Sequence, residues 1–221
     1  MIRPGLQWIA TGSCNECGSM RVRLIRANEK DVIEEIVSIH LAAFQGFFLT
    51  FLGRGFLRQM YRSYCEHVDS GLLAVFSEGR PAGFLAYSEN MRGLYKFMLR
   101  RKLIPFAWYG LWAFLRKPAV FTHLLRAFLK PGQARREEKY VELASIGVTP
   151  SKKSQGIGSR LMAELKGRVD FEEYAYIALE TDAVNNDAVN CFYQRNGFAL
   201  EREYTTPEGR RMNEYRYRRT V

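Results

Sequence analysis

One short stretch of this chain, Lys153-Ser154-Gln155-Gly156-Ile157-Gly158-Ser159, has residue types and spacing suited to binding a phosphate group. It follows an apolar, β-permissive run over residues 140–148, and Pro150 fixes a turn between the two. Apolar residues at helical spacing then predict a helix that begins near Gly158. Glycine lets backbone N–H groups approach an anion closely at the positive end of a helix. The stretch therefore predicts a phosphate cradle built from backbone rather than from a catalytic side chain.

Two common phosphate-binding motifs are excluded. The chain contains no GxxxxGK[ST] sequence, and no GxGxxG sequence followed by an acid about 20 residues later. A tight turn from strand to helix, with no ligand, is an alternative explanation of Gly156 and Gly158 when they are taken alone.

The wider pattern around the cradle resembles the acetyl-CoA signature of the GNAT superfamily of N-acetyltransferases. Val148-x-Pro150 is followed by Lys153-x-x-Gly156-x-Gly158, with Lys153 where the superfamily usually has arginine or glutamine. Residues 186–198 resemble the later motif of the same superfamily, with Val189 where alanine is usual. The resemblance covers about residues 20–218. It implies an α/β (α+β) fold, a mixed and mostly antiparallel twisted sheet of about six or seven strands flanked by helices.

The resemblance also implies which residues bind the co-substrate acetyl-CoA. Backbone groups of Ile146 and Val148 would contact the pantetheine arm, and Asn186 would contact CoA or cap its helix. Tyr193 stands where many of these enzymes have a tyrosine that protonates the CoA sulfur. The pyrophosphate would be held by a run of seven residues: Lys153, Ser154, Gln155, Gly156, Ile157, Gly158 and Ser159.

Tyr193 and Glu142 are the candidate catalytic residues. A phenol of pKa near 10 can donate a proton to a thiolate of pKa near 8.5. Glu142 is the candidate general base, because it precedes Lys153 by 11 residues, a spacing found in a yeast histone acetyltransferase of the superfamily. Glu180 is the second candidate. Strand alternation predicts that Glu142 shares a face with Ala144, Ile146 and Val148, and that Ser145 points the other way.

Gly147 is expected to form a β-bulge that separates its strand from the neighbouring strand. Cys191 is expected to face the core. Because the sequence offers no base beside this cysteine, direct acetyl transfer in a ternary complex is favoured over a covalent intermediate.

Composition predicts one folded domain, over residues 20–221, that follows an N-terminal extension at 1–19. Apolar residues make up 47% of the 221-residue chain. Four cysteines do not suggest a disulfide framework, which favours a reducing cytoplasm. Cys14 and Cys17 form a CxxC without the second pair that a zinc site needs. No metal site is predicted, and no charge-free apolar run reaches the length of a transmembrane helix.

Residues 91–138 are read as a basic helical insertion between the third and fourth strands. They hold 11 Lys or Arg and two Glu, so they carry +9 of the net charge of +10. Three helices are expected there, over 94–103, 105–115 and 118–129. An aromatic, uncharged run over 103–115 lies between basic margins. It fits a subdomain packed on the core or on a second subunit, a peripheral membrane contact through 91–130, or a surface for an anionic substrate.

The remaining elements are expected to be strands and helices, with 72–76 and 81–87 paired as an antiparallel hairpin. We expect strands over 21–26, 72–76, 81–87 and 177–181, a helix over 186–196, and a closing hairpin over 198–218. Asn28 is expected to be the N-cap of the first helix. His40, on the apolar stripe of that helix, is interpreted as a core residue.

The sequence thus predicts an N-acetyltransferase that moves an acetyl group from acetyl-CoA to a primary amine. If the insertion faces the cleft, its charge would repel polyamines and favour an anionic acceptor, such as an amino sugar on a nucleotide or lipid carrier. The alternative is a GNAT-like binding protein whose basic aromatic helices dock on a membrane or a partner, with little catalysis. Nucleic acid is disfavoured, because the aromatic residues lie inside apolar runs. Whether the chain forms a homodimer is left open by the sequence.

Overall fold

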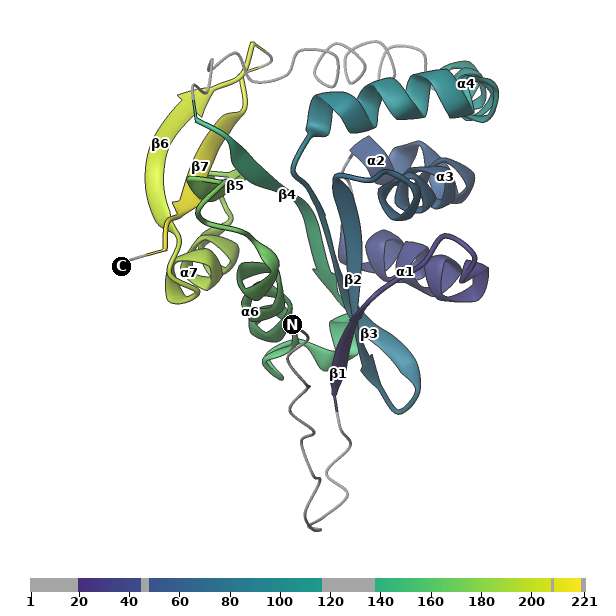
Figure 1. The fold of residues 1–221 in the computed structure, drawn as a ribbon. Coiled ribbons are helices and arrows are strands. Elements are labelled where there is room, and N and C mark those ends of the chain that lie inside the picture. Colours follow the sequence, from purple (N-terminus) through teal and green to yellow (C-terminus); the bar gives the residue numbers. More distant parts are fainter. Residues whose placement is uncertain (1–19, 45–47, 117–137, 208, 220–221) are drawn as a thin grey trace, which may run out of the picture.

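The computed structural model describes residues 20–44, 48–116, 138–207 and 209–219, and these form a seven-stranded sheet with helices on both faces (Figure 1). The strand order is β1-β2-β3-β4-β5-β7-β6. In chain order the elements are β1 (Arg21–Leu24), α1 (Lys30–Ala43), α2 (Phe48–Phe51), α3 (Gly53–Glu66), β2 (Ser70–Ser77), β3 (Arg80–Ser88), α4 (Met91–Arg116), β4 (Tyr140–Val148), a short 3₁₀ turn (Pro150–Lys152), α6 (Ile157–Arg168), β5 (Tyr176–Asp182), α7 (Asp187–Arg195), β6 (Ala199–Thr205) and β7 (Arg211–Tyr217).

The sheet is antiparallel except between its two central strands. β4 and β5 run parallel, and every other neighbouring pair is antiparallel. The predicted mixed, mostly antiparallel sheet is therefore confirmed. The β2–β3 hairpin turns through Glu78 and Gly79, both with positive φ, as a two-residue hairpin loop requires. Gly197 also has positive φ (76°) and follows Asn196, the C-cap of α7, so it ends that helix.

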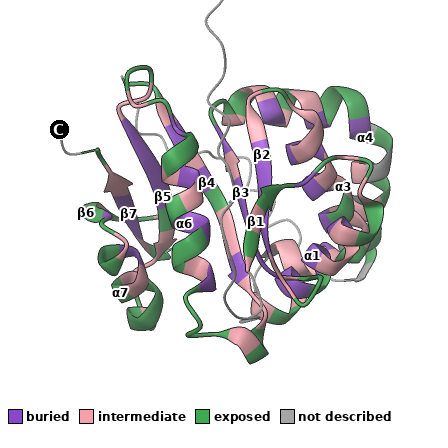
Figure 2. Ribbon diagram, turned by 60° about the horizontal axis from the view of Figure 1, so that its bottom comes forward, coloured by how far each residue is buried: buried purple, intermediate pink, exposed green. Residues whose placement is uncertain are grey.

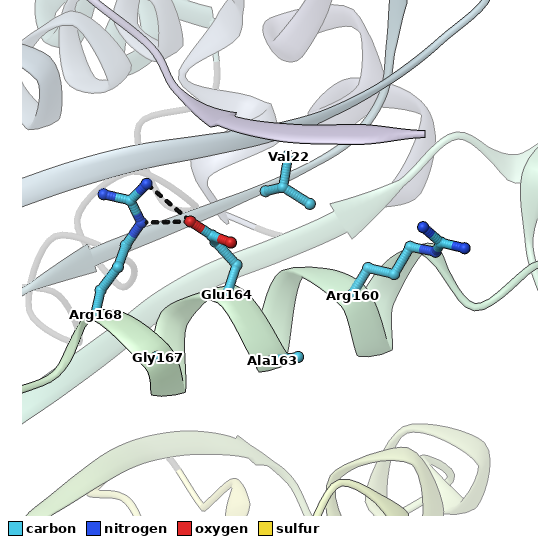
Figure 3. Close-up of a pocket in the computed structure, with 6 residues that line it drawn as sticks. All are labelled: Val22, Arg160, Ala163, Glu164, Gly167 and Arg168. Atoms are coloured by element: carbon cyan, nitrogen blue, oxygen red, sulfur yellow. Dashed lines mark hydrogen bonds and ion pairs between the residues drawn. The ribbon is translucent and has the colours of Figure 1, made fainter. Parts of the chain in front are cut away.

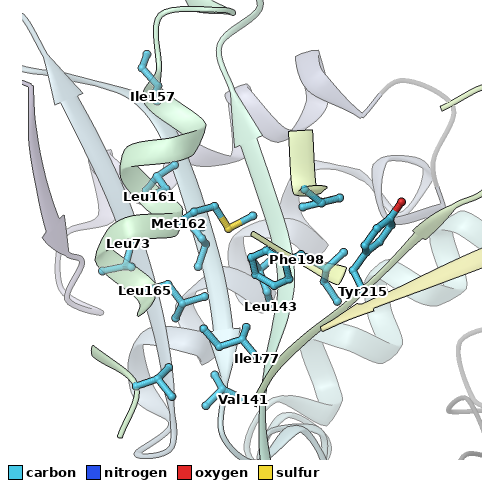
Figure 4. Packing of buried hydrophobic residues seen from close by; sticks show 14 of the residues in the cluster. Leu73, Val141, Leu143, Ile157, Leu161, Met162, Leu165, Ile177, Phe198 and Tyr215 are labelled. Carbon is cyan, nitrogen blue, oxygen red and sulfur yellow. The ribbon is translucent and has the colours of Figure 1, made fainter. Parts of the chain in front are cut away.

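Each face of the sheet buries its own apolar cluster. Helices α6 and α7 cover one face, with side chains such as Leu143, Leu161 and Ile177 (Figure 4). Helices α1, α3 and α4 cover the other face over β2, β3 and β4, with Ile36, Leu57 and Phe84 among the buried residues. Strands β2, β3 and β5 contain runs of consecutive buried residues (Figure 2), as expected for strands that are covered on both faces.

Two local predictions are corrected. Asn28 is not the N-cap of α1; Glu29 occupies that position, and its Oε1 accepts a hydrogen bond from Arg26 N at 2.7 Å. Gly147 is not a bulge, because it pairs in regular register with Phe84. The register shifts instead where Ala86 opposes Ser145 and Tyr87 opposes Leu143, which leaves Ala144 as the extra residue.

Gly147 has a packing reason to be glycine. A Cβ atom there would lie 2.7 Å from Cε1 of Phe84 and 3.2 Å from Cε2 of Phe44, so a side chain would displace both rings. The glycine lets two aromatic rings of the α1 face approach the strand.

The first two helices expected in the insertion form one kinked element. α4 follows β3 and bends at Lys102, whose φ of −132° and ψ of 24° are not helical. The third expected helix, over 118–129, lies outside the described residues, as do residues 1–19 with the Cys14/Cys17 pair. In the part that is described, no helix is long and apolar enough to cross a membrane. No cluster of three or more His, Cys, Asp or Glu that could hold a metal occurs in that part either.

Candidate active site

The two parallel strands at the centre of the sheet separate part-way along their length. β4 and β5 pair only through Tyr140–Tyr176, Val141–Ile177 and Glu142–Ala178. Beyond those pairs β4 stays bonded to β3, while β5 stays bonded to β7 as far as Asp182. The backbone edges of residues 143–148 and 179–182 therefore face each other across a widening gap (Figure 1).

The bulge at Ala144 explains why the gap opens at this place. It begins two residues after the last pair with β5, and a bulge bends its strand and increases the local twist. The extra residue also reverses the alternation of side chains. Glu142 and Ser145 thus lie on the face covered by α1, α3 and α4, whereas Leu143, Ile146 and Val148 pack against the α6 face. The expectation that Glu142 shares a face with Ile146 and Val148, and opposes Ser145, was wrong.

The predicted phosphate cradle lies at the end of β4, where the gap is widest. Ser154 and Gly156 have φ values of 63° and 75°, which turn the chain sharply before α6. The first backbone bond of the helix is from Arg160 N to Gly156 O at 3.0 Å. The N–H groups of Ile157, Gly158 and Ser159 precede that bond and point out of the helix start, where the helix dipole favours an anion.

The side chains at the cradle leave it open to solvent. Residues 153–156 and Ser159 are exposed, and only Ile157 is buried. Lys152 turns away, because its Nζ donates to Ser77 Oγ at 2.8 Å. Arg160, one turn into the helix, is exposed and lines a shallow groove between α6 and β1 (Figure 3). In that view the Arg160 side chain stands apart from the Glu164–Arg168 ion pair, so the positively charged groups beside the cradle are Lys153 and Arg160.

Gly158 has a different role from Gly156. A Cβ at Gly158 would lie 2.9 Å from Cζ of Phe192, whereas a Cβ at Gly156 would have nothing within 4 Å. The first glycine is needed for its positive φ, and the second lets α7 pack against the start of α6. This contact joins the start of α6 to the last turn of α7, where Phe192 lies.

Three asparagines fix α7 to the strands beside the gap. Asn186 Nδ2 donates to Thr181 Oγ1 at 2.8 Å and to Asp182 O at 3.0 Å. Asn190 Nδ2 donates to Asn186 O, and Asn190 Oδ1 accepts from Asn213 on β7 at 3.1 Å. Asn186 occupies the N-cap position but makes no side-chain capping bond. Its amide instead holds the start of α7 to the end of β5.

Tyr193 lies on the inner face of α7, within the apolar cluster of the α6 face. It is 7% exposed and its ring packs on Phe198 and Tyr215, with centroid separations of 6.2 and 5.9 Å. Burial raises the pKa of this phenol above its ordinary value, so the hydroxyl is protonated at neutral pH. Cys191, two residues earlier, is exposed on the same helix, so the prediction that it faces the core was wrong.

Glu142 faces tyrosines on the other side of the sheet. The half-buried carboxylate lies near Tyr64 of α3 and Tyr95 of α4. Burial first, and then the negative charges of Glu142 and Glu180, raise the pKa of Tyr95. Tyr204 of β6 donates to Glu180 Oε2 at 2.7 Å. The two predicted carboxylates thus act on the same tyrosine, which places them in one electronegative region.

A buried hydrogen-bonded chain leads from this region into the core. Ser145 interacts with the Tyr61 hydroxyl, and that hydroxyl lies 2.6 Å from His40 Nδ1. Burial lowers the pKa of His40 to about 4, so its imidazole is neutral at neutral pH. His40 is 2% exposed, which confirms the prediction that it is a core residue.

The basic residues described on α4 do not face this region. Arg92, Lys96 and Arg100 recur every four residues on the exposed side of the helix, opposite buried Leu94 and Met98. The side of α4 that faces the sheet instead presents Tyr95 toward Glu142.

Sequence comparison identifies the family to which this arrangement belongs. The family model described as acetyltransferase (GNAT) matches residues 33–198, about three-quarters of the chain. The chain belongs to the acetyltransferase (GNAT) family. The match includes β4, the cradle and α7, which together border the gap.

The solved structures of GNAT proteins share this fold at low sequence identity. A protein of Desulfovibrio desulfuricans assigned to the GNAT family is 16% identical, with 90% of this chain and 99% of that chain covered and a TM-score of 0.58. The Escherichia coli ribosomal-protein-S18-alanine N-acetyltransferase is 13% identical, with 92% and 96% covered and a TM-score of 0.54. Arabidopsis thaliana NAA60, solved in complex with acetyl-CoA, is 15% identical, with 90% and 98% covered and a TM-score of 0.54. A search of curated proteins gives no match.

Two residues that border the GNAT site were not singled out from the sequence. Arg160 could have been found, because it follows Gly156 by four residues and so lies one turn above the cradle. Tyr95 could not, because its direction depends on how α4 packs against the sheet.

Proposed function

We propose that this GNAT protein transfers an acetyl group from acetyl-CoA to a primary amine, by direct attack in a ternary complex. The observation that carries the proposal is the separation of β4 from β5 directly below an open helix N-terminus. Such a gap offers unpaired strand edges to an extended amide-containing arm, and the helix start offers N–H groups to a diphosphate. Both features face the same end of the sheet.

In this proposal the co-substrate is held mainly by backbone. The strand edge at Ile146 and Val148 binds the pantetheine arm, and the N–H groups from Lys153 to Ser159 bind the diphosphate. Lys153 and Arg160 add positive charge at the edge of the cradle. Asn186 holds α7 in place, since its amide donates to β5.

The chemistry needs one base and one acid. The amine nitrogen attacks the thioester carbon, a C–N bond forms and the C–S bond breaks. Glu142 takes a proton from the amine, and the Tyr193 hydroxyl gives a proton to the departing thiolate. Glu142 and Tyr193 lie on opposite faces of the sheet. In this proposal both act on the reacting groups at the gap between β4 and β5. Cys191 is not required, since the amine attacks acetyl-CoA directly.

We further propose that the acceptor is a cationic amine. The carboxylates of Glu142 and Glu180 lie on the same side of the sheet, and both act on Tyr95, whose pKa is raised first by burial and then by their negative charges. The exposed basic residues of α4 point away from that side. The anionic acceptor expected from the charge of the insertion is therefore the less favoured class, as far as the described residues go.

Acetyl-CoA titration followed by calorimetry tests the co-substrate, and a thiol-release assay tests the acceptor. We expect micromolar binding of acetyl-CoA, and higher kcat/KM for polyamines and other cationic amines than for amino-sugar phosphates. No heat of binding at high micromolar acetyl-CoA would remove the enzyme proposal. Turnover restricted to anionic amines would remove only the cationic acceptor.

A further inference from the structure

The second half of α4 presents a continuous apolar stripe to solvent. Five residues on this stripe are large and apolar, and each is at least half exposed: Ile104 (83%), Trp108 (59%), Leu111 (52%), Trp112 (50%) and Leu115 (68%). Their spacing of four, three, one and three residues follows one face of a helix. Exposed apolar residues gathered in this way mark an interaction surface rather than scattered surface positions.

The opposite side of the helix is fixed against α3, so the stripe cannot rotate inward. The ring of Phe106 packs on Phe56 with centroids 4.8 Å apart. Tyr109 lies so close to Gly55 that a Cβ there would come within 2.3 Å of its ring. The helix is therefore held by its inner face, at the outer edge of the molecule (Figure 1).

The charged residues of α4 itself are all of one sign. Residues 91–116 contain no Asp or Glu and six Lys or Arg: Arg92, Lys96, Arg100, Arg101, Lys102 and Arg116. The first four are exposed. Lys102, at the kink, is buried and its Nζ lies 2.9 Å from Glu66 Oε2. The exposed side of α4 thus changes from basic in its first half to apolar in its second.

We propose that this exposed side of α4 docks on the surface of an anionic lipid bilayer. The apolar stripe would enter the boundary between headgroups and acyl chains, where tryptophan is especially stable, and the arginines and lysine would contact anionic headgroups. The helix lies on the bilayer, since it is not apolar enough to cross one.

A second copy of the chain fits the same surface less well. In a two-fold contact each copy must satisfy the surface of the other, and residues 91–116 supply no acid to face the basic residues of the partner. An anionic bilayer supplies the opposite charge and the apolar environment together.

Vesicle co-sedimentation of the full chain tests the proposal. We expect binding to phosphatidylcholine vesicles that hold about one-third phosphatidylglycerol, and at least about tenfold weaker binding to pure phosphatidylcholine. The triple variant Trp108→Ser/Leu111→Ser/Trp112→Ser should lose at least about tenfold in partitioning to the anionic vesicles. These positions are exposed, so circular dichroism and the melting temperature should stay near those of the wild type.

A matched control removes exposed apolar residues elsewhere. Val68→Ser/Val184→Ser/Leu200→Ser changes positions that are 90%, 49% and 49% exposed and are not part of the stripe, so it should bind vesicles as the wild type does. The charge variant Arg92→Gln/Lys96→Gln/Arg100→Gln should lose mainly the salt-sensitive part of the binding, which about 0.5 M salt screens.

Two outcomes would overturn the proposal. One is that the wild type and the Trp108 triple variant sediment equally with anionic vesicles, or that neither sediments. The other is a concentration-dependent dimer of the wild type in size-exclusion chromatography that the triple variant no longer forms, because the stripe would then contact a second copy. In a Trp8→Phe background, Trp108 and Trp112 should shift their emission to shorter wavelength only when anionic vesicles are added.

Discussion

The two faces of β4 carry different kinds of residue. On the α6 face, Val141 and Leu143 are buried in an apolar cluster that extends to Ile157 and Leu161 (Figure 4). On the α3 and α4 face, Glu142 and Ser145 meet the tyrosines of the neighbouring helices. In the proposed mechanism the first face supports the cradle for the co-substrate, and the second holds the titratable groups that a proton transfer needs. The bulge at Ala144 determines which side chains of β4 lie on each face.

The largest expected effect comes from removing the carboxylate on the polar face. Glu142→Gln keeps the size of the side chain but cannot accept a proton, so kcat should fall by about 10²- to 10⁴-fold. The dissociation constant of acetyl-CoA should stay within about twofold, because the residue is not part of the cradle. Glu203→Gln on β6, which removes an exposed ion pair with Arg211, is the control and should retain full turnover. Normal kcat in Glu142→Gln would transfer the role of base to Glu180 or to water.

The polar face should also make stability depend on pH. The pKa of His40 is lowered to about 4 by burial, from an ordinary value near 6.5. Between these values the unfolded chain binds a proton that the folded chain does not, so stability is lost as the pH falls. The loss should reach about 3 kcal/mol at pH 4. Urea denaturation at pH 7 and pH 4.5 measures it, and His40→Gln, which does not titrate, should show a flatter dependence. Equal pH dependence in both proteins would contradict this reading of His40.

On the apolar face, Tyr193→Phe should lower kcat by about ten- to a hundredfold with little change in the affinity for acetyl-CoA. Its ring contacts with Phe198 and Tyr215 are kept, so the melting temperature should hardly change. Because burial raises the pKa of Tyr193, wild-type kcat should show no decline from this group between pH 7 and about 9.5. Full turnover by the phenylalanine variant would remove the proposed general acid.

The smallest expected effect distinguishes two glycines of the α6 region. Gly156→Ala forces a side chain into positive φ and should destabilise the protein by about 1–2 kcal/mol, with weaker acetyl-CoA binding. Gly167→Ala is the control: it lies within α6, and its new Cβ meets nothing within 4 Å. It should be neutral or stabilise the protein by up to about 1 kcal/mol. Thermal unfolding measures both, and equal shifts would show that backbone strain at Gly156 is not the cause.

The fold was largely predictable from the sequence because its signals are local. The cradle and the later motif each lie within about a dozen consecutive residues, and the order of strands and helices follows from short apolar patterns. What could not be predicted depends on partners far away in the chain. The position of the bulge is set by the register with β3, which sequence alternation alone cannot reveal. That one-residue error moved Glu142 to the wrong face.

The candidate site also has residues that could be predicted from local motifs and residues that could not. The cradle residues and Tyr193 could be named because each lies within a contiguous motif. Tyr95 was missed because it comes from α4, more than 40 residues before Glu142 in the chain. The direction in which the basic residues of the insertion point was left open for the same reason. A sum of lysines and arginines does not say which side of a helix they occupy.

The break in α4 at Lys102 makes the helix two separable units. Tyr95, before the break, lies near Glu142, the proposed base, and Trp108, after it, lies on the outer surface. Residues 103–116 could therefore be grafted from another sequence to readdress the enzyme to a different location, while the chemistry next to Glu142 is inherited unchanged.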